Sequence, residues 1–459
     1  MKRCLALDSF RGYLILGVIF AYLMPREGLP SWLYAAKHGL GASDLLFPGL
    51  LFCLGVAIPL SMEKRLPQGE PVSVEEANQH VAQWVSAAGR LVLRASLLVG
   101  VAYVLPNLAR APEAPIFFVL LCLVLVRLDE KQETASLVLN CIGIAAIGIA
   151  LLKVGFARSP DKFFLILGFN ALAGGLTFLF ARKSSSSRLM MMLIWGLILI
   201  VGQQQGWVRQ MVQWRVLGEL QPLALLKFQL VVLPGIALGD ALLHSNEKSP
   251  KMDRWPMLLN SLFGLVGICL TVWAANSGEL EYGFVLCTLL GINAIWFAHP
   301  WSFMRSVQSW GWGLLLIGML LVPMGGVHAG PGTLSYMLLA AGVGTMVFGL
   351  IWALTLFTRV GRVAVSEEAL RELALDRSEF AAQPEPRQGY VALGGQNPLV
   401  AYMAVVCLAI SLPRLTGLEA WHQAQKWGLG EETAYAAALT LTIGALAAGL
   451  TRLGLRLRA

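Results

Sequence analysis

Charged residues are scarce in this sequence. Only 14% of the 459 residues are Asp, Glu, Lys or Arg, whereas about 25% is usual for soluble domains. So few charges cannot cover the surface of a soluble protein of this length. The seven cysteines are scattered and form no C-x-x-C pair, so neither a disulfide framework nor a zinc site is indicated. We expect no bound metal.

Several familiar signatures are also missing. The sequence holds no Walker loop, no H-E-x-x-H and no G-x-S-x-G motif, which removes the commonest nucleotide, zinc-protease and serine-hydrolase patterns. No A-x-A cleavage site follows the first apolar run, so we interpret that run as a retained first helix. No segment alternates as the strands of an outer-membrane barrel do. Helices are therefore the expected spanning structure.

Long apolar runs are what the chain has instead. Hydrophobic residues make up 57% of it, and they gather in runs near the about 20 residues that cross a bilayer. The candidate spans are 10–24, 44–62, 87–105, 116–126, 135–152, 163–181, 189–202, 223–243, 255–275, 283–298, 310–325, 335–357, 393–412 and 433–450. Because some are short, we predict an all-α, polytopic transmembrane helix bundle of about 11–14 spans, forming one integral membrane domain over residues 1–459.

The distribution of Lys and Arg predicts the orientation. With the N-terminus inside, these residues occur about twice as often in the inner segments as in the outer ones. We therefore expect both termini in the cytoplasm, with longer cytoplasmic loops at about 63–86 and 359–392. In the first loop, Ser73 and Glu76 have capping-box spacing, so a helix should start there and continue into the third span. The net charge of +8 follows from this bias, and no nucleic-acid partner is expected.

Three arginines fall within predicted spans, where a charge is costly. Arg11 lies three residues after Asp8, so the two share a helix face and form either an interfacial ion pair or part of a polar cavity. Arg90 and Arg94 share a face of the third span. Their guanidinium groups suit either a phosphate-bearing ligand or lipid headgroups, and we leave both interpretations open.

A second set of polar residues falls at the predicted external side. Asp44 opens the second span, where a carboxylate stabilises the start of a helix. Its alternative role is to orient His38, which could act as a general base or a nucleophile. His328 lies in the loop GGVHAGPGTLSY and Lys227 near the start of the eighth span. These two are candidate substrate-binding residues.

Asn397 lies in the stretch GGQNPLVAY, near the cytoplasmic start of a predicted span. Because Pro398 follows it, the pair could break or cap a helix. We include Asn397 among the candidate substrate-binding residues.

Several stretches together resemble the heparan-alpha-glucosaminide N-acetyltransferase family, and its bacterial branch most closely. They begin with ALDSFRGYLILGVIF, LPSWLYAAKHG and GASDLLFPGLLFCLGVAIPLSMEKRL. Later stretches are LLKFQLVVLPGIALGDALL, GTLSYMLLAAG and GGQNPLVAY. The most diagnostic block is D-S-F-R-G followed by S-D-L-L-F-P.

The resemblance implies a membrane-embedded acyltransferase. Such enzymes carry an acetyl group from cytoplasmic acetyl-CoA, a co-substrate, to an amine or hydroxyl acceptor, often on a glycan, at the external face. By this likeness Arg11, Arg90 and Arg94 would bind CoA phosphates, and His38 with Asp44 would carry the chemistry. The chain has Tyr22 where the family has Asn, and Tyr34 ten residues before Asp44 where the family has its His.

Two other functions remain open. A transporter or flippase for an anionic or lipid-linked substrate would use the same arginines without a covalent step. A non-catalytic membrane protein would keep the motifs only for its fold. Lipid is an expected partner in every case, a homodimer is left open, and a bacterial inner membrane is the expected location.

Overall fold

The computed structural model describes most of the apolar helices. The described residues are 4–24, 40–63, 73–108, 159–181, 185–204, 221–245, 254–298, 301–329, 332–373, 389–405, 428–452 and 456–457, with isolated residues at 66, 210 and between 116 and 157. His38 and Tyr34 lie outside them, as do most of the predicted fourth and fifth spans. The structure therefore tests neither residue.

The regular secondary structure of the described residues is helical apart from one pair of two-residue strands, β1 (Val126–Arg127) with β2 (Arg456–Leu457). The first helices are α1 (Leu5–Leu23), α2 (Ala42–Met62), α3 (Val74–Leu108), α6 (Lys162–Phe180), α7 (Ser185–Gln204), α9 (Pro222–Leu226) and α10 (Gln229–His244). The later ones are α11 (Arg254–Ser277), α12 (Leu280–Phe297), α13 (Ser302–Leu320), α14 (Val322–Gly325), α15 (Leu334–Leu373), α17 (Tyr390–Gly395), α18 (Pro398–Ala404) and α21 (Leu429–Arg452).

Eight of the described helices are long and apolar enough to cross a membrane, and two shorter apolar ones lie at Ser187–Ile198 and Gln229–His244. Many of their large apolar side chains are exposed, among them Leu193, Leu289 and Trp296. Exposed apolar faces on helices of this length fit contact with lipid. The prediction of an all-α polytopic membrane bundle is therefore confirmed, and the chain is an integral membrane protein.

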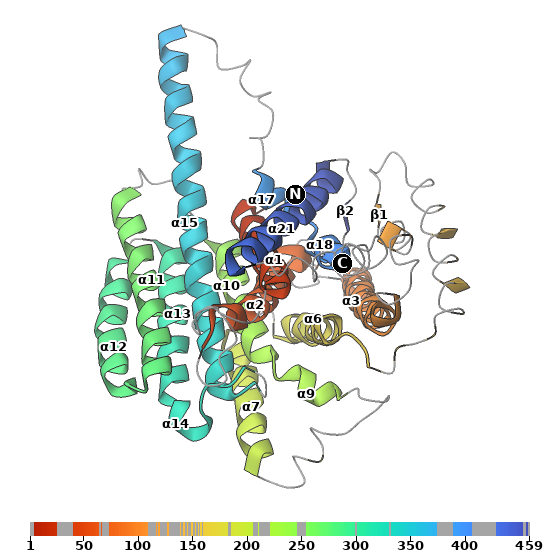
Figure 1. The fold of residues 1–459 in the computed structure, drawn as a ribbon, viewed down its shortest axis with the longest axis horizontal. Coiled ribbons are helices and arrows are strands. Elements are labelled where there is room, and N and C mark those ends of the chain that lie inside the picture. The colour runs from red at the N-terminus through yellow and green to blue at the C-terminus, as the bar shows by residue number, and fades with distance from the viewer. Residues whose placement is uncertain are drawn as a thin grey trace.

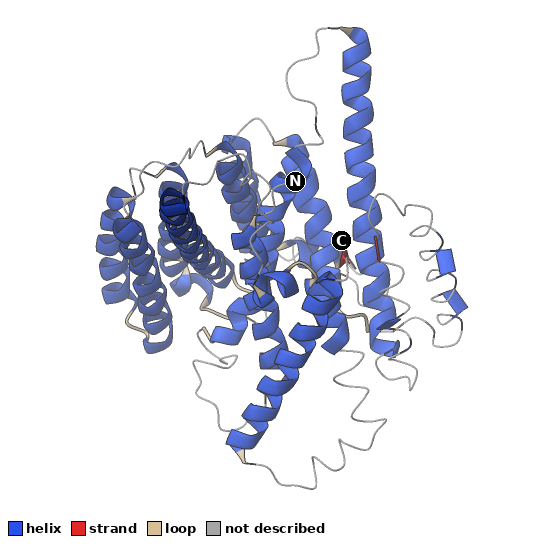
Figure 2. Ribbon diagram, turned by 90° about the horizontal axis from the view of Figure 1, so that it is seen from above, coloured by secondary structure: helices blue, strands red, loops and turns tan. Residues whose placement is uncertain are grey.

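The helices pack in two sets around α1, α2 and α10. In Figure 1, helices α11, α12, α13 and α15 lie on one side, and α3 packs against α6 on the other. Figure 1 shows α15 along its length and α3 nearly end on, whereas Figure 2, seen from above, shows α3 along its length. The two sets of helices therefore cross steeply.

Glycines allow α2 to pack closely on both of its central neighbours. A Cβ at Gly55 of α2 would lie 2.2 Å from the carbonyl oxygen of Val232 in α10, and one at Gly235 would lie 2.4 Å from that of Phe52. Glycine is the residue that permits backbones to approach this closely in membrane bundles. Helix α2 also runs antiparallel to α1, because Gly17 packs on Leu46 while Gly49 packs on Leu14.

The structure confirms one predicted helix start and extends another helix beyond its predicted end. Helix α3 starts at Val74, and the Glu76 N–H donates to the Ser73 hydroxyl at 3.1 Å, as the capping-box spacing predicts. Helix α15 continues beyond the predicted end of its span at residue 357 as far as Leu373, into the stretch predicted as a cytoplasmic loop. No proline interrupts residues 334–373, so nothing in the backbone forces an end there.

The predicted eighth span is not one continuous helix, because it is interrupted at Lys227 and Phe228, between α9 and α10. The Leu225 carbonyl, which would accept a helical hydrogen bond, instead accepts one from the Asn170 side chain of α6 at 2.9 Å. Gln229 in turn donates to the Asn170 carbonyl and side-chain oxygens, both at 3.0 Å. Contacts with α6 thus replace the helical bonds at the break.

Candidate functional site

The backbone just before α2 is held by a distant side chain. The Leu40 N–H donates to Asn276 Oδ1 at 2.9 Å, and Asn276 Nδ2 donates to the Leu40 carbonyl at 3.1 Å. Leu40 is fully buried. Asn276 lies in the last turn of α11, so its amide fixes the point at which the chain enters α2.

Asp44 caps the helix that it opens. Its Oδ2 accepts the Gly41 N–H at 3.1 Å, and its backbone carbonyl accepts the Tyr336 hydroxyl of α15 at 2.6 Å. The predicted stabilising role at the start of the helix is therefore confirmed. The predicted partner His38 lies outside the described residues, so the catalytic role of Asp44 stays a prediction. We call the end of the bundle at which α2 begins the Asp44 end.

His328 lies in a tightly hydrogen-bonded loop that leads into α15. Its N–H donates to Thr333 Oγ1 at 3.2 Å, and its carbonyl accepts the N–H groups of Gly332 and Thr333. Gly326 and Gly332 have φ values of 66° and 64°, which L-residues with a side chain rarely adopt. The two glycines let the loop turn sharply enough for these bonds to form.

Lys227 lies against the same loop. A Cβ at Gly332 would be 2.8 Å from Lys227 Nζ, so the ammonium group contacts the loop that carries His328. The amine also lies 5.5 Å from the centre of the Phe228 ring, within the range of a cation–π interaction. The structure thus brings Lys227, the His328 loop and the start of α15 to the Asp44 end, although the sequence separates them widely.

The three predicted phosphate-binding arginines lie elsewhere. Arg11 is half-buried in α1, and its Nη2 donates to the Cys53 carbonyl of α2 at 3.3 Å. Arg90 is exposed and Arg94 half-buried on α3, which packs against α6. Arg11 therefore faces the α1–α2 contact, whereas Arg90 faces outward from a different helix pair.

Asn397 interrupts a helix, as the Asn-Pro pair predicts, because α17 ends at Gly395 and α18 begins at Pro398. Its Nδ2 donates to Thr451 Oγ1 of α21 at 2.7 Å, and the side chain is fully buried. Gly395 packs on the carbonyl of Asp8. Because α1 and α2 are antiparallel, this places Asn397 toward the opposite end of the pair from Asp44.

Two polar features escaped the sequence analysis. Asn276 gave no signal, because only folding brings it beside Leu40, 236 residues away. Asp240 of α10 likewise has a partner that no local pattern indicates, because the two lie 52 residues apart. Arg188 of α7 donates to Asp240 Oδ2 at 2.8 Å, with only 6% of the arginine side chain exposed. This pair, buried at its arginine end and partly exposed at its carboxylate, ties α7 to α10.

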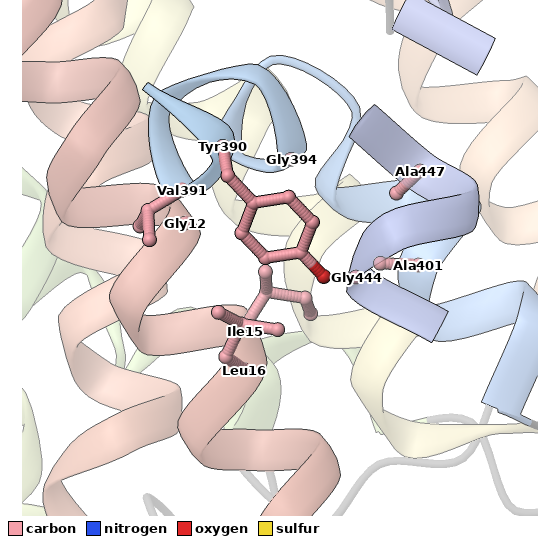
Figure 3. Close-up of a pocket in the computed structure, with 9 residues that line it drawn as sticks. All are labelled: Gly12, Ile15, Leu16, Tyr390, Val391, Gly394, Ala401, Gly444 and Ala447. Atoms are coloured by element: carbon pink, nitrogen blue, oxygen red, sulfur yellow. The ribbon is translucent and has the colours of Figure 1, made fainter. Parts of the chain in front are cut away.

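A small crevice between α1, α17, α18 and α21 is apolar (Figure 3). Its walls are mainly glycine, alanine and aliphatic side chains, with the Tyr390 ring across it. Its cavity volume of ≈ 10 Å³ has room for about one water molecule, far less than a small-molecule ligand needs. It holds none of the predicted site residues.

Fold and geometry together define a polytopic helical membrane protein with a polar cluster at one end. More particularly, the chain belongs to the family described as a domain of unknown function (DUF5009), whose model matches residues 3–242. No curated protein matches the chain. The matched region includes Arg11, Asp44 and Lys227, whereas Asn276, His328 and Asn397 lie beyond it.

Proposed function

We propose that this protein is a membrane-embedded acyltransferase. It would move an acyl group, in the first instance acetyl, from cytoplasmic acyl-CoA to an amine or hydroxyl acceptor, such as a sugar, at the external face. The protein would lie in a bacterial inner membrane with both termini in the cytoplasm. The sequence resemblance described above suggests this reaction, and the distribution of Lys and Arg favours the orientation.

The observation that most supports the proposal is the polar cluster at the Asp44 end. Asp44, Lys227 and the His328 loop come from three distant stretches of the chain and converge there. Polar groups that converge in a membrane protein at this cost usually serve substrate or ions. Arg11 lies farther along the same α1–α2 pair, on the side where the proposal puts the CoA phosphates.

In this mechanism His38 acts as general base or as an acyl-carrying nucleophile, and Asp44 supports it. As a base, His38 accepts the proton of the acceptor while the acceptor attacks the thioester carbonyl and the CoA thiolate leaves. Lys227 and His328 bind the acceptor, and Arg11, Arg90 and Arg94 bind the phosphates.

The test is release of free CoA by purified protein supplied with acetyl-CoA and a panel of amino and hydroxyl sugars. We expect His38→Ala to abolish acceptor-dependent release while the protein still inserts and folds. His244→Ala is the matched control, because that side chain is 68% exposed in α10. Undiminished release in His38→Ala would remove His38 from the mechanism.

A transporter or flippase for an anionic or lipid-linked substrate is the second candidate. The interrupted helices α9/α10 and α17/α18 favour it, because broken helices often line transport sites. Substrate movement across proteoliposomes without any release of free CoA would select this function over acyl transfer.

A further inference from the structure

The chain enters α2 through residues 40–44, and side chains from far along the sequence form hydrogen bonds to both ends of this segment. The Asn276 side chain forms hydrogen bonds to both backbone groups of Leu40, to the N–H at 2.9 Å and to the carbonyl at 3.1 Å. An asparagine amide offers one acceptor and two donors, so its orientation suits both bonds at once. A carboxylate, which only accepts, or an ammonium group, which only donates, would satisfy one of the two groups.

A second distant side chain forms a hydrogen bond four residues later, at Asp44. The Tyr336 hydroxyl donates to the Asp44 carbonyl at 2.6 Å, although that carbonyl is also available to the backbone of α2. Between these two attachments, Asp44 itself accepts the Gly41 N–H. Residues 40–44 are thus fixed by two bonds within the segment, both between Gly41 and Asp44, and by three bonds from α11 and α15.

Both holding residues come from outside the region that the family model matches. That region ends at residue 242, whereas Asn276 closes α11 and Tyr336 opens α15. We propose that Asn276 and Tyr336 are positioning residues, through which the second half of the chain fixes Leu40 and Asp44 for the reaction. The role in the reaction rests on the proposed function. The attachment of residues 40–44 to α11 and α15 rests on the hydrogen bonds alone.

The geometry favours positioning over simple closure of a helix end. A helix start at a bundle surface can satisfy its free N–H groups with water or a local cap, and Asp44 already supplies a local cap. The Leu40 bonds instead tie a fully buried residue to α11, and the Tyr336 bond fixes the segment relative to α15, into which the His328 loop leads. Small displacements of reacting groups are costly to catalysis.

The test compares Asn276→Leu with Asn293→Leu in the full-length protein. Asn293 is an exposed residue of α12 whose amide donates to Leu289 of its own helix, so the control removes an asparagine without touching the segment. Tyr336→Phe has Tyr282→Phe as its control, since Tyr282 is 69% exposed. Hydrogen–deuterium exchange of peptides covering residues 40–46 and steady-state kinetics are measured for each variant.

In Asn276→Leu we expect exchange in this segment to rise about tenfold, as the loss of two hydrogen bonds implies. We also expect kcat to fall with little change in the KM for acetyl-CoA. Asn276→Asp, which keeps the acceptor for the Leu40 N–H, should lie between Asn276→Leu and wild type in both readouts. The two control variants should match wild type.

Unchanged exchange in Asn276→Leu would show that Asn276 does not fix residues 40–44. Raised exchange with a wild-type kcat would show that fixing them does not serve the reaction. A wild-type protein that transfers no acyl group to any acceptor would refute the proposed function, and with it the reaction for which the segment is positioned. Even then, the ratio of exchange rates between Asn276→Leu and Asn293→Leu would decide whether Asn276 fixes residues 40–44.

Discussion

Two interrupted helices in this molecule are built in contrasting ways. At the α17/α18 break, Asn397 is fully buried and bonded to Thr451, and the glycine before it packs against the backbone of α1. At the α9/α10 break, Lys227 is only half-buried and its ammonium group lies against the glycine loop that carries His328. The first break is closed by packing, whereas the second presents a charge beside another polar loop.

The difference shows that an interrupted helix in a membrane protein does not by itself mark a functional site. A break whose polar groups are all taken up by neighbouring helices serves the fold. One that keeps a charged side chain partly accessible beside other polar groups is a better candidate for binding. The comparison therefore predicts stability effects at the α17/α18 break and functional effects at the α9/α10 break.

The largest effect is expected from Gly395→Ala at the first break. The new Cβ would lie 1.8 Å from the Asp8 carbonyl oxygen and 2.6 Å from the Gly12 nitrogen, so α1 and α17 must separate. Overpacking on this scale costs about 1–3 kcal/mol or more. We expect a clear fall in yield and in the thermal unfolding temperature in detergent.

Gly394→Ala is the matched control, because a Cβ there meets only the Gly444 carbonyl oxygen at 3.9 Å. This variant should unfold at nearly the wild-type temperature. Equal stability of the two alanine variants would contradict the close approach of α17 to α1.

A smaller effect is expected from Asn397→Ala. The change removes the hydrogen bond to Thr451, which still has the carbonyls of Leu393 and Ala447 as acceptors. The loss should lower the free energy of unfolding by about 0.5–1.5 kcal/mol, measured against Asn293→Ala. Turnover per folded molecule should stay at the wild-type value, and a raised KM for the acceptor would instead assign Asn397 to substrate binding.

The sequence predicted the helices well because apolar length alone defines them. The starts of α2 and α3 and the break at Asn397 follow from local signals, namely a first-turn carboxylate, a capping box and an Asn-Pro pair. The break at Lys227 could not be predicted in this way. It depends on Asn170, which takes a carbonyl 55 residues away in sequence, and local patterns carry no information about such pairings.

The candidate site was predictable only in part, for the same reason. Asp44, Lys227 and His328 stood out as polar residues in or beside apolar segments, and the structure brings the last two together. Asn276 and Tyr336 act through backbone groups of the partner segment, which any residue possesses. Composition and spacing therefore do not indicate these contacts. Asn276 and Tyr336 can be identified only from the packing of the helices.

The smallest effect on stability, and the one that most sharpens the comparison, is expected from Lys227→Met. Methionine keeps the length and apolar stem of the side chain, so the free energy of unfolding should stay within about 0.5 kcal/mol of wild type. If Lys227 binds the acceptor, loss of its charge-assisted hydrogen bond costs about 1.5–3 kcal/mol. We therefore expect kcat/KM for the acceptor to fall by roughly tenfold or more, with acetyl-CoA binding retained.

Lys162→Met, at an exposed lysine that begins α6, is the matched control. Wild-type kcat/KM in Lys227→Met would place this break with the one at Asn397, as a feature of the fold alone.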